Sequence, residues 1–255
     1  APFSMPGMMD TVLNLGLNDV SVNGLIAQTD NPRFGWDSYR RFIQMFSNVV
    51  MGVDADLFEN AITSRKLAKG VKSDTDLTAD DLKDLAGQFK EIFSKNVDAK
   101  EHPEVADASG KVSFPQDPQL QLKLAIEAVF GSWMNSRAIL YRKQNKISDD
   151  LGTAVNVQVM VFGNKGETSA TGVAFTRNPA DGTNERYGDF LVNAQGEDVV
   201  AGIRNTEPIA DLIKLPAFKE SGKELFHIFE VLEDHYRDMM DIEFTIEQGK
   251  VWMLQ

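Results

Sequence analysis

Two carboxylates and an amide near the end of the sequence have the types and spacing of a Mg²⁺–phosphate site. In the run DIEFTIEQGKVWMLQ, Asp241 and Glu243 alternate with apolar residues and therefore share one face of an expected strand. The turn signal Gln248-Gly249 follows, and the returning strand ends at Gln255. Carboxylate and amide oxygens are hard ligands of the kind that Mg²⁺ takes together with phosphate oxygens.

The length of this turn decides whether the three side chains meet. A loop of three residues, 248–250, places Gln255 opposite Glu243, whereas a loop of two residues places Leu254 there. An ordinary hairpin with an exposed polar face has the same alternation. The sequence alone leaves both registers, and both interpretations, open.

Three further segments carry groups that suit a phosphate or a purine, and each also has a purely structural interpretation. NVQVMVFGN (156–164) fits a core strand, or a strand end that offers backbone groups to a purine edge. NAQGEDVVAG (193–202) sets an amide, a glycine and two carboxylates between expected strands, and by pattern alone it is a turn. In DSYRRFIQMF (37–46), one of Arg40 and Arg41 should face solvent; the alternative is a guanidinium fork aimed at a phosphate.

Near the start, SMPGMMDT (4–11) gathers three methionines around a Pro-Gly pair with neither a helical nor a strand period. By pattern alone this stretch is a disordered end or an expression remnant.

The elements that position these groups are helical in the first half of the chain. Apolar residues recur at helical spacing after Asp37 or Ser38, either of which is a fair N-cap, and again over 56–70. A third helix starts at Thr78, whose partner Asp81 completes a T-x-x-D cap. Residues 99–116 break all periodicity and indicate a long loop. Helices over 117–133 and 136–147 follow, the first with proline at its tolerated first position.

From residue 153 the period changes to two, which indicates strands. The expected strands are TAVNVQVMVF, TGVAFTR, DFLVNA, DVVAGI and the two arms of the terminal hairpin, with a helix over 217–239. We therefore expect an α+β fold, with a mainly helical subdomain over 1–150 and an α+β subdomain built on an antiparallel sheet over 151–255.

Composition excludes several classes of function. The net charge of −12 repels nucleic acid and anionic membranes, but a small phosphate ligand remains possible beside Mg²⁺ and a few arginines. The absence of cysteine excludes disulfides and thiolate metal sites, and three histidines without ligand spacing make a histidine metal site improbable. No apolar run reaches the ~20 residues of a membrane span, and no secretory signal is visible. The lack of an initiator methionine fits a chain that begins partway into a longer protein.

Taken in order, six segments of the chain resemble the pyruvate, phosphate dikinase family. They cover nearly all of the chain except the loop around 97–116 and the stretch 206–235. The segments are SMPGMMDTVLNLGLND, NPRFGWDSYRRFIQMF, DTDLTADDLK, GTAVNVQVMVFGNKGETSATGVAFTRNP, NAQGEDVVAGIR and DIEFTIEQGKVWMLQ.

The resemblance implies an ATP-grasp nucleotide-binding domain that holds Mg-ATP between two subdomains. It implies that a histidine on a separate swivelling domain is pyrophosphorylated by ATP, with release of AMP. Inorganic phosphate then takes one phosphoryl group to give pyrophosphate, and the other converts pyruvate to phosphoenolpyruvate, reversibly. It further implies a cytoplasmic enzyme, an organelle not being excluded, whose intact form is a homodimer.

The resemblance also assigns roles to residues. Asp241, Glu243 and Gln255 match the family's Mg²⁺–phosphate cluster, and Arg41 matches a phosphate-contacting arginine; Arg41, Glu243 and Gln255 are the expected catalytic residues. The expected ATP contacts are Gln158, Met160 and Val161 for the adenine, Thr171 and Glu197 along the nucleotide, and Met9 in the loop 4–11 that closes over the phosphates.

The chain departs from the family pattern at its ends. The lysine segment GGKG, the segment SVRSGA with its arginine, the arginine after Gln255, the histidine domain and the pyruvate-binding barrel are absent. One expectation is therefore that the isolated chain is inactive and acts only as a weak nucleotide-binding or interaction module. Another is that the loop 4–11 is disordered without the strand that precedes it in the family.

Overall fold

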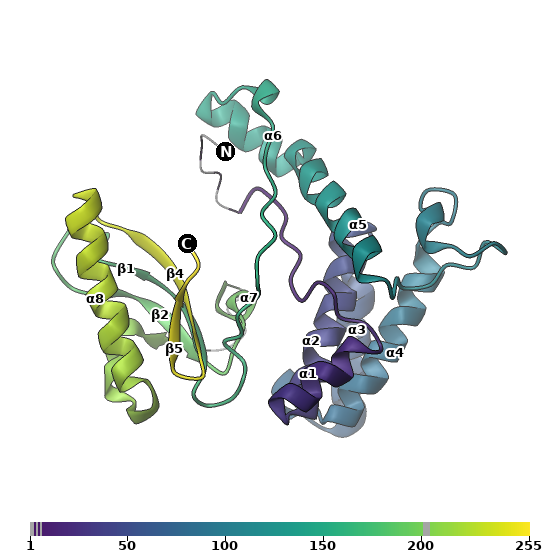
Figure 1. Cartoon of the computed structure of the whole chain (residues 1–255), viewed down its shortest axis with the longest axis horizontal. Helices are drawn as coiled ribbons and strands as arrows, with labels where there is room; N and C mark the ends of the chain where they lie inside the picture. The colour runs from purple at the N-terminus through teal and green to yellow at the C-terminus, as the bar shows by residue number, and fades with distance from the viewer. Residues whose placement is uncertain (1–2, 4, 6, 201–204) are drawn as a thin grey trace. The chain divides into compact units, whose positions relative to one another are not determined.

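The computed structural model describes residues 3, 5, 7–200 and 205–255, and the chain divides into two compact units. Unit 1 is Ala1–Gln158 and unit 2 is Val159–Gln255 (Figure 1). The functional boundary expected near residue 150 stays a prediction.

Unit 1 is built from helices. Its elements are α1 (Ser21–Thr29), α2 (Pro32–Met45), the π-helical turn η1 (Phe46–Val50), α3 (Ala55–Lys69), η2 (Asp74–Asp76), α4 (Ala79–Asn96), η3 (Pro103–Val105), α5 (Pro118–Gly131), η4 (Ser132–Met134), α6 (Ser136–Asn145) and η5 (Asp149–Leu151).

The sequence signals fix most of these helix ends. The α3 helix ends at Gly70 in the left-handed conformation, at φ 69°. Thr78 and Asp81 form both halves of the capping box of α4, as their spacing predicts. Asp117 caps α5 by accepting a hydrogen bond from the backbone N–H of Gln119 at 3.0 Å.

The start of α2 differs from the prediction. Asn31 caps the helix by accepting from the Phe34 N–H at 3.0 Å, and Pro32 occupies the first turn. Asp37 and Ser38 therefore lie inside the helix, and neither is its N-cap. A proline with an asparagine before it is a start signal of its own, and it outweighs the two later candidates.

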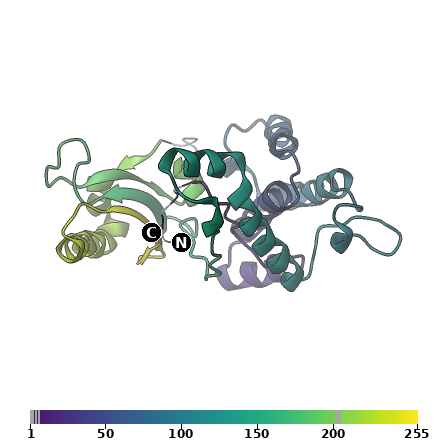
Figure 2. The same cartoon turned by 90° about the horizontal axis from the view of Figure 1, so that it is seen from above.

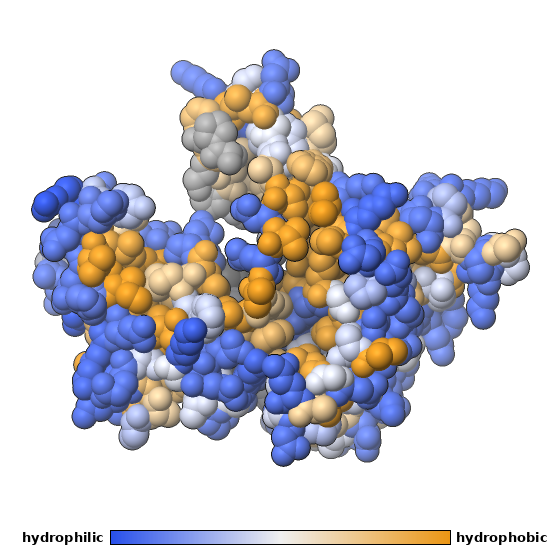
Figure 3. Space-filling view, viewed as in Figure 1, coloured by the Kyte–Doolittle hydropathy of each residue, from blue (hydrophilic) through white to orange (hydrophobic). Residues whose placement is uncertain are grey.

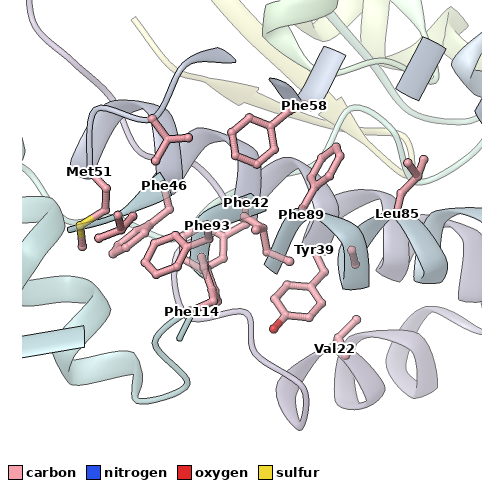
Figure 4. Packing of buried hydrophobic residues seen from close by; sticks show 14 of the residues in the cluster. Val22, Tyr39, Phe42, Phe46, Met51, Phe58, Leu85, Phe89, Phe93 and Phe114 are labelled. Atoms are coloured by element: carbon pink, nitrogen blue, oxygen red, sulfur yellow. The ribbon is translucent and has the colours of Figure 1, made fainter. Parts of the chain in front are cut away.

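The core of unit 1 is aromatic and includes a residue from the expected loop (Figure 4). Phe114 packs edge-on against Phe42, Phe46 and Phe93, with ring centroids 5.4–5.6 Å apart. Residues 99–116 do lack regular structure apart from η3 and an isolated bridge between Ala106 and Val112. The loop nevertheless contributes to the core, because Phe114 is buried among the helices.

Unit 2 is an antiparallel sheet with helices, which confirms the predicted α+β class. In the described part of the unit, five strands lie in the order β3-β2-β1-β4-β5, and every paired neighbour is antiparallel. Its elements are β1 (Ala170–Phe175), β2 (Tyr187–Val192), α7 (Gly196–Val200), β3 (Glu207–Pro208), η6 (Ile209–Lys214), η7 (Pro216–Phe218), α8 (Lys219–Tyr236), β4 (Asp241–Glu247) and β5 (Lys250–Met253).

One face of this sheet is covered by α8, as both views of the ribbon show (Figures 1 and 2). Ile242, Phe244 and Ile246 of β4 are buried there in one cluster with Leu225 and Phe229 of α8. Because side chains alternate along a strand, the other residues of β4, including the expected metal ligands Asp241 and Glu243, lie on the opposite face.

Two expected strands are not found among the described residues. In that part of the chain, residues 153–162 belong to no strand, and Val157 and Val159 are 64% and 90% exposed instead of half-buried. In DVVAGI, residues 198–200 belong to α7, and 201–203 lie outside the described residues. Alternation alone does not make a strand, because the backbone of a strand needs a neighbouring strand with which to form hydrogen bonds.

Candidate functional site

The terminal hairpin begins in the two-residue register. Glu247 pairs with Lys250, so the loop consists of Gln248 and Gly249, both at positive φ (49° and 83°). Continued without interruption, this register would place Leu254 opposite Glu243.

A β-bulge at the end of the hairpin changes this outcome. The carbonyl of Glu243 accepts from the N–H groups of both Leu254 (2.9 Å) and Gln255 (3.3 Å), and the Glu243 N–H donates to the Gln255 carbonyl at 2.9 Å. Two residues of one strand thus lie opposite one residue of the other, which is the definition of a bulge. Gln255 therefore lies across from Glu243 despite the two-residue loop.

The carboxylates of this cluster lie on the sheet face opposite α8. Asp241 and Glu243 are exposed, and their partners on β1 are Phe175 and Val173. Among the described residues, no three His, Cys, Asp or Glu side chains are grouped as a metal site requires. Mg²⁺ with a bound phosphate commonly takes only one or two carboxylates from the protein, and Gln255, also exposed, would add an amide oxygen. The oxygen donors present thus fit Mg²⁺.

Thr171 lies on the same face, next to this cluster. It is 3% exposed and lies directly opposite Thr245, one alternation along β4 from Glu243. Its hydroxyl is 3.2 Å from the Phe244 carbonyl, to which it donates, and 3.3 Å from the Thr245 hydroxyl. These contacts fix the Thr171 side chain within the sheet.

The expected adenine segment belongs to no helix or strand in the described part of the chain, and it is anchored at its end. Gln158 is exposed at the end of unit 1, while Met160 and Val161 are half-buried in unit 2. The carbonyl of Gly163 accepts from the Ala194 N–H at 3.0 Å, and a Cβ at position 163 would lie 2.4 Å from the Ala194 carbonyl oxygen. This contact, for which glycine is required, brings the end of the adenine segment beside the start of the NAQGEDVVAG segment.

Glu197 falls within α7 of that second segment, and its side chain lies outside what the structure describes. The role expected for Glu197 therefore stays a prediction.

In unit 1, Arg41 is held by a carboxylate on its own helix. Its Nε donates to Asp37 Oδ2 at 3.1 Å, and the other oxygen of Asp37 accepts from Arg40 Nε at 2.9 Å. The Arg40 side chain is 5% exposed and that of Arg41 is 16% exposed. The expectation that one arginine faces solvent is therefore wrong, because Asp37 pairs with both.

The same arrangement sets the pKa of Asp37. Burial alone would raise this pKa, but the charges of Arg40, Arg41 and Arg33 and the hydrogen bond from Arg41 outweigh burial and lower the pKa to about 2. The sequence contains the signal for this pairing, since Asp37 precedes the arginines by three and four residues. An Asp37 at the N-cap would not be available for this pairing, which is why the predicted helix start does not include it.

The described part of the loop 4–11 is tied to the helices. The Asp10 N–H donates to Ser132 Oγ at 3.1 Å, its carboxylate pairs with Arg137, and Arg137 Nε donates to the Met8 carbonyl at 3.2 Å. Met9, between these anchors, is half-buried. Ser4 and Pro6 lie outside the described residues.

Within the described residues, no helix combines the length and the apolar character needed to cross a bilayer. In the view of Figure 3, polar side chains cover much of both units, and apolar side chains gather in patches among the polar ones.

Comparison with known proteins identifies the family. Residues 1–219 and 217–255 match the family described as "Pyruvate phosphate dikinase, AMP/ATP-binding domain". The chain is 56% identical to pyruvate, phosphate dikinase of Clostridium symbiosum over 252 residues, which are 99% of this chain and 27% of that protein. It is 54% identical over 255 residues to the chloroplastic pyruvate, phosphate dikinase of Mesembryanthemum crystallinum, covering 100% of this chain and 25% of that one.

A third relative is the pyruvate, phosphate dikinase of Rhizobium meliloti (strain 1021), 53% identical over 262 residues, with 99% of this chain and 28% of the relative covered. The chain thus spans about a quarter of the length of these relatives. Because the family match extends over the whole chain, the chain belongs to the pyruvate phosphate dikinase AMP/ATP-binding domain family.

Proposed function

We propose that this chain is the ATP-grasp-like nucleotide-binding region of a pyruvate, phosphate dikinase. It would bind Mg-ATP, whose pyrophosphoryl group is then transferred to a histidine elsewhere in the full-length protein. The observation that carries the proposal is the bulge that brings Gln255 across from Glu243, on the strand that also carries Asp241. This arrangement supplies the oxygen donors that the family resemblance assigns to a Mg²⁺–phosphate cluster.

The chain's own residues have distinct roles in this proposal. Asp241, Glu243 and Gln255 would hold Mg²⁺, which when bound neutralises charge on the phosphate oxygens. Arg41 would stabilise negative charge on the transferred phosphate, because a guanidinium group matches phosphate geometry.

The remaining contacts of the proposal position the nucleotide. Met160 and Val161 would pack against the adenine, beside Gln158, while Thr171 and Glu197 would line the nucleotide. Met9 would lie in the loop over the phosphates. The ties from Asp10 and Met8 to Ser132 and Arg137 support this last assignment, since they hold both sides of Met9.

The full-length protein would then convert ATP, phosphate and pyruvate to AMP, pyrophosphate and phosphoenolpyruvate, reversibly. The printed names of the relatives support this activity. We further propose that it acts as a homodimer and in the cytoplasm, with an organelle as the alternative.

The test is product analysis with the full-length protein. Incubation with ATP, phosphate and pyruvate is expected to give AMP and pyrophosphate in equal amounts with phosphoenolpyruvate. Formation of ADP without AMP would reject the proposal.

A further inference from the structure

We propose that Asp37 is a positioning residue for Arg41, holding the guanidinium group in the orientation that the phosphoryl-transfer step requires. The inference rests on the proposed function, since it concerns the same reaction. Asp37 is not among the site residues that the family resemblance implies.

The geometry of α2 places the two side chains together. Asp37 and Arg41 are four residues apart and therefore lie on the same face of the helix, one turn from each other. The contact runs from Arg41 Nε to Asp37 Oδ2 at 3.1 Å. A contact at Nε fixes the plane of the guanidinium group, and with it the direction of the remaining N–H donors.

Burial makes this contact a rigid one. The side chain of Asp37 is 7% exposed and that of Arg41 is 16% exposed, so water competes little for the pair. An arginine that is already oriented loses less conformational entropy when it meets a phosphate than one that samples its rotamers in solvent. The Arg41 side chain is more exposed than that of Arg40, which is only 5% exposed. Arg41 is therefore the better placed of the two to meet a ligand.

Asp37 is itself held by further contacts. Its Oδ1 lies 2.8 Å from Arg40 Nη2, and the same nitrogen lies 3.6 Å from Asp74 Oδ2. Arg33 donates to the carbonyls of Asp74 at 2.8 Å and Leu77 at 2.9 Å. These bonds connect α2 to η2, so the carboxylate that orients Arg41 cannot turn away easily.

The experiment uses the full-length protein and a double-mutant cycle. The variants are Asp37→Asn, which keeps the shape but removes the charge, Arg41→Ala, and the two combined. Asp84→Asn is the matched control, because it removes a carboxylate that also pairs with an arginine, Arg65 at 3.1 Å, but is not part of the network that holds Asp37. The measured quantities are the kcat and KM of AMP formation from ATP, the phosphoenolpyruvate–pyruvate exchange rate and thermal unfolding.

If Asp37 acts through Arg41, Asp37→Asn lowers the kcat of AMP formation about 10- to 100-fold. The rate of phosphoenolpyruvate–pyruvate exchange stays within twofold of that of the unchanged protein. In the Arg41→Ala background the same change then has less than a twofold further effect, because the interaction is already gone. The kcat of AMP formation by Asp84→Asn stays within twofold of that of the unchanged protein.

Three results would overturn the inference: an unchanged kcat in Asp37→Asn, an unchanged kcat in Arg41→Ala, or losses that multiply in the double variant. Equal loss of both half-reactions would also overturn it, since that is the mark of a general folding defect. If the unaltered protein makes no AMP at all, the proposed function itself fails, and this outcome is separate from the others.

Discussion

At the scale of single residues, neighbouring side chains of the terminal hairpin lie in different environments. Alternation gives Phe244 to the core and leaves Asp241 and Glu243 on the exposed face. The bulge then places Gln255 across the hairpin from Glu243. Bulges are common beside active sites, where they redirect a side chain without breaking the sheet.

We predict that Glu243→Ala and Gln255→Ala in the full-length protein each lower the rate of AMP formation about 100-fold or more, because a ligand to the proposed metal is lost. Phosphoenolpyruvate–pyruvate exchange should be spared. The control is Lys250→Ala at the exposed start of β5, which should change neither rate by more than about twofold. Equal loss of both half-reactions in the Glu243 variant would point to misfolding.

A second residue-scale prediction concerns acid stability. The pKa of Asp37 is about 2 in the folded chain against an ordinary value of 3.8, so its ionised form stabilises the fold above about pH 4. That contribution, about 2 kcal/mol, disappears as the pH falls through about 2. Urea unfolding between pH 5 and 2 should therefore show a shallower loss of stability for Asp37→Asn than for the unchanged chain. Identical slopes would contradict the prediction.

At the scale of elements, the core of unit 1 depends on a segment with no regular secondary structure. Phe114 lies between α2 and α4, touching Phe42, Phe46 and Phe93 (Figure 4). A loop that contributes a central ring is held in place by its packing, even where it has no ladder of backbone hydrogen bonds.

We predict that Phe114→Ala lowers the free energy of unfolding of unit 1 by about 3–5 kcal/mol, because a buried ring is lost and a cavity remains. Phe130→Ala is the control, since this ring on α5 is 50% exposed, and its effect should stay below about 1 kcal/mol. Chemical denaturation followed by circular dichroism measures both. Similar effects of the two variants would show that Phe114 is not central to the core.

At the scale of the whole molecule, the two units have separate cores. The aromatic core of unit 1 and the sheet-and-helix core of unit 2 are distinct clusters. The chain passes from one unit to the other within residues 153–162, which lie in no helix or strand of the described structure and include the exposed Val157 and Val159.

This arrangement predicts where a protease cuts first. Elastase, which prefers small aliphatic residues, should cleave the 255-residue chain near Val157 or Val159 before any other site, because an unpaired, exposed backbone fits a protease best. Mass spectrometry of the early products should give fragments close to 1–158 and 159–255. Initial cleavage inside a helix of unit 1 or a strand of unit 2 would contradict the prediction.

The sequence by itself determined the features that depend on neighbouring residues. The capping box of Thr78 and Asp81, the proline start of α5, the Gln248-Gly249 turn and the alternation of β4 are all local signals, and the structure contains each of them. The α+β class follows from the same periodicities, and the ordered motifs were sufficient to indicate the family that the comparisons then established.

The tertiary structure alone decided what depends on partners far along the chain. Whether 153–162 becomes a strand depends on a neighbouring strand, and whether Phe114 is buried depends on helix residues such as Tyr39, 75 positions earlier in the sequence. The bulge at Gln255 and the pairing of Asp37 with both arginines were likewise fixed by geometry and burial. The local pattern of a segment determines which of its residues share a polar or an apolar face. Burial and hydrogen bonding with distant parts of the chain determine which residues that face contacts.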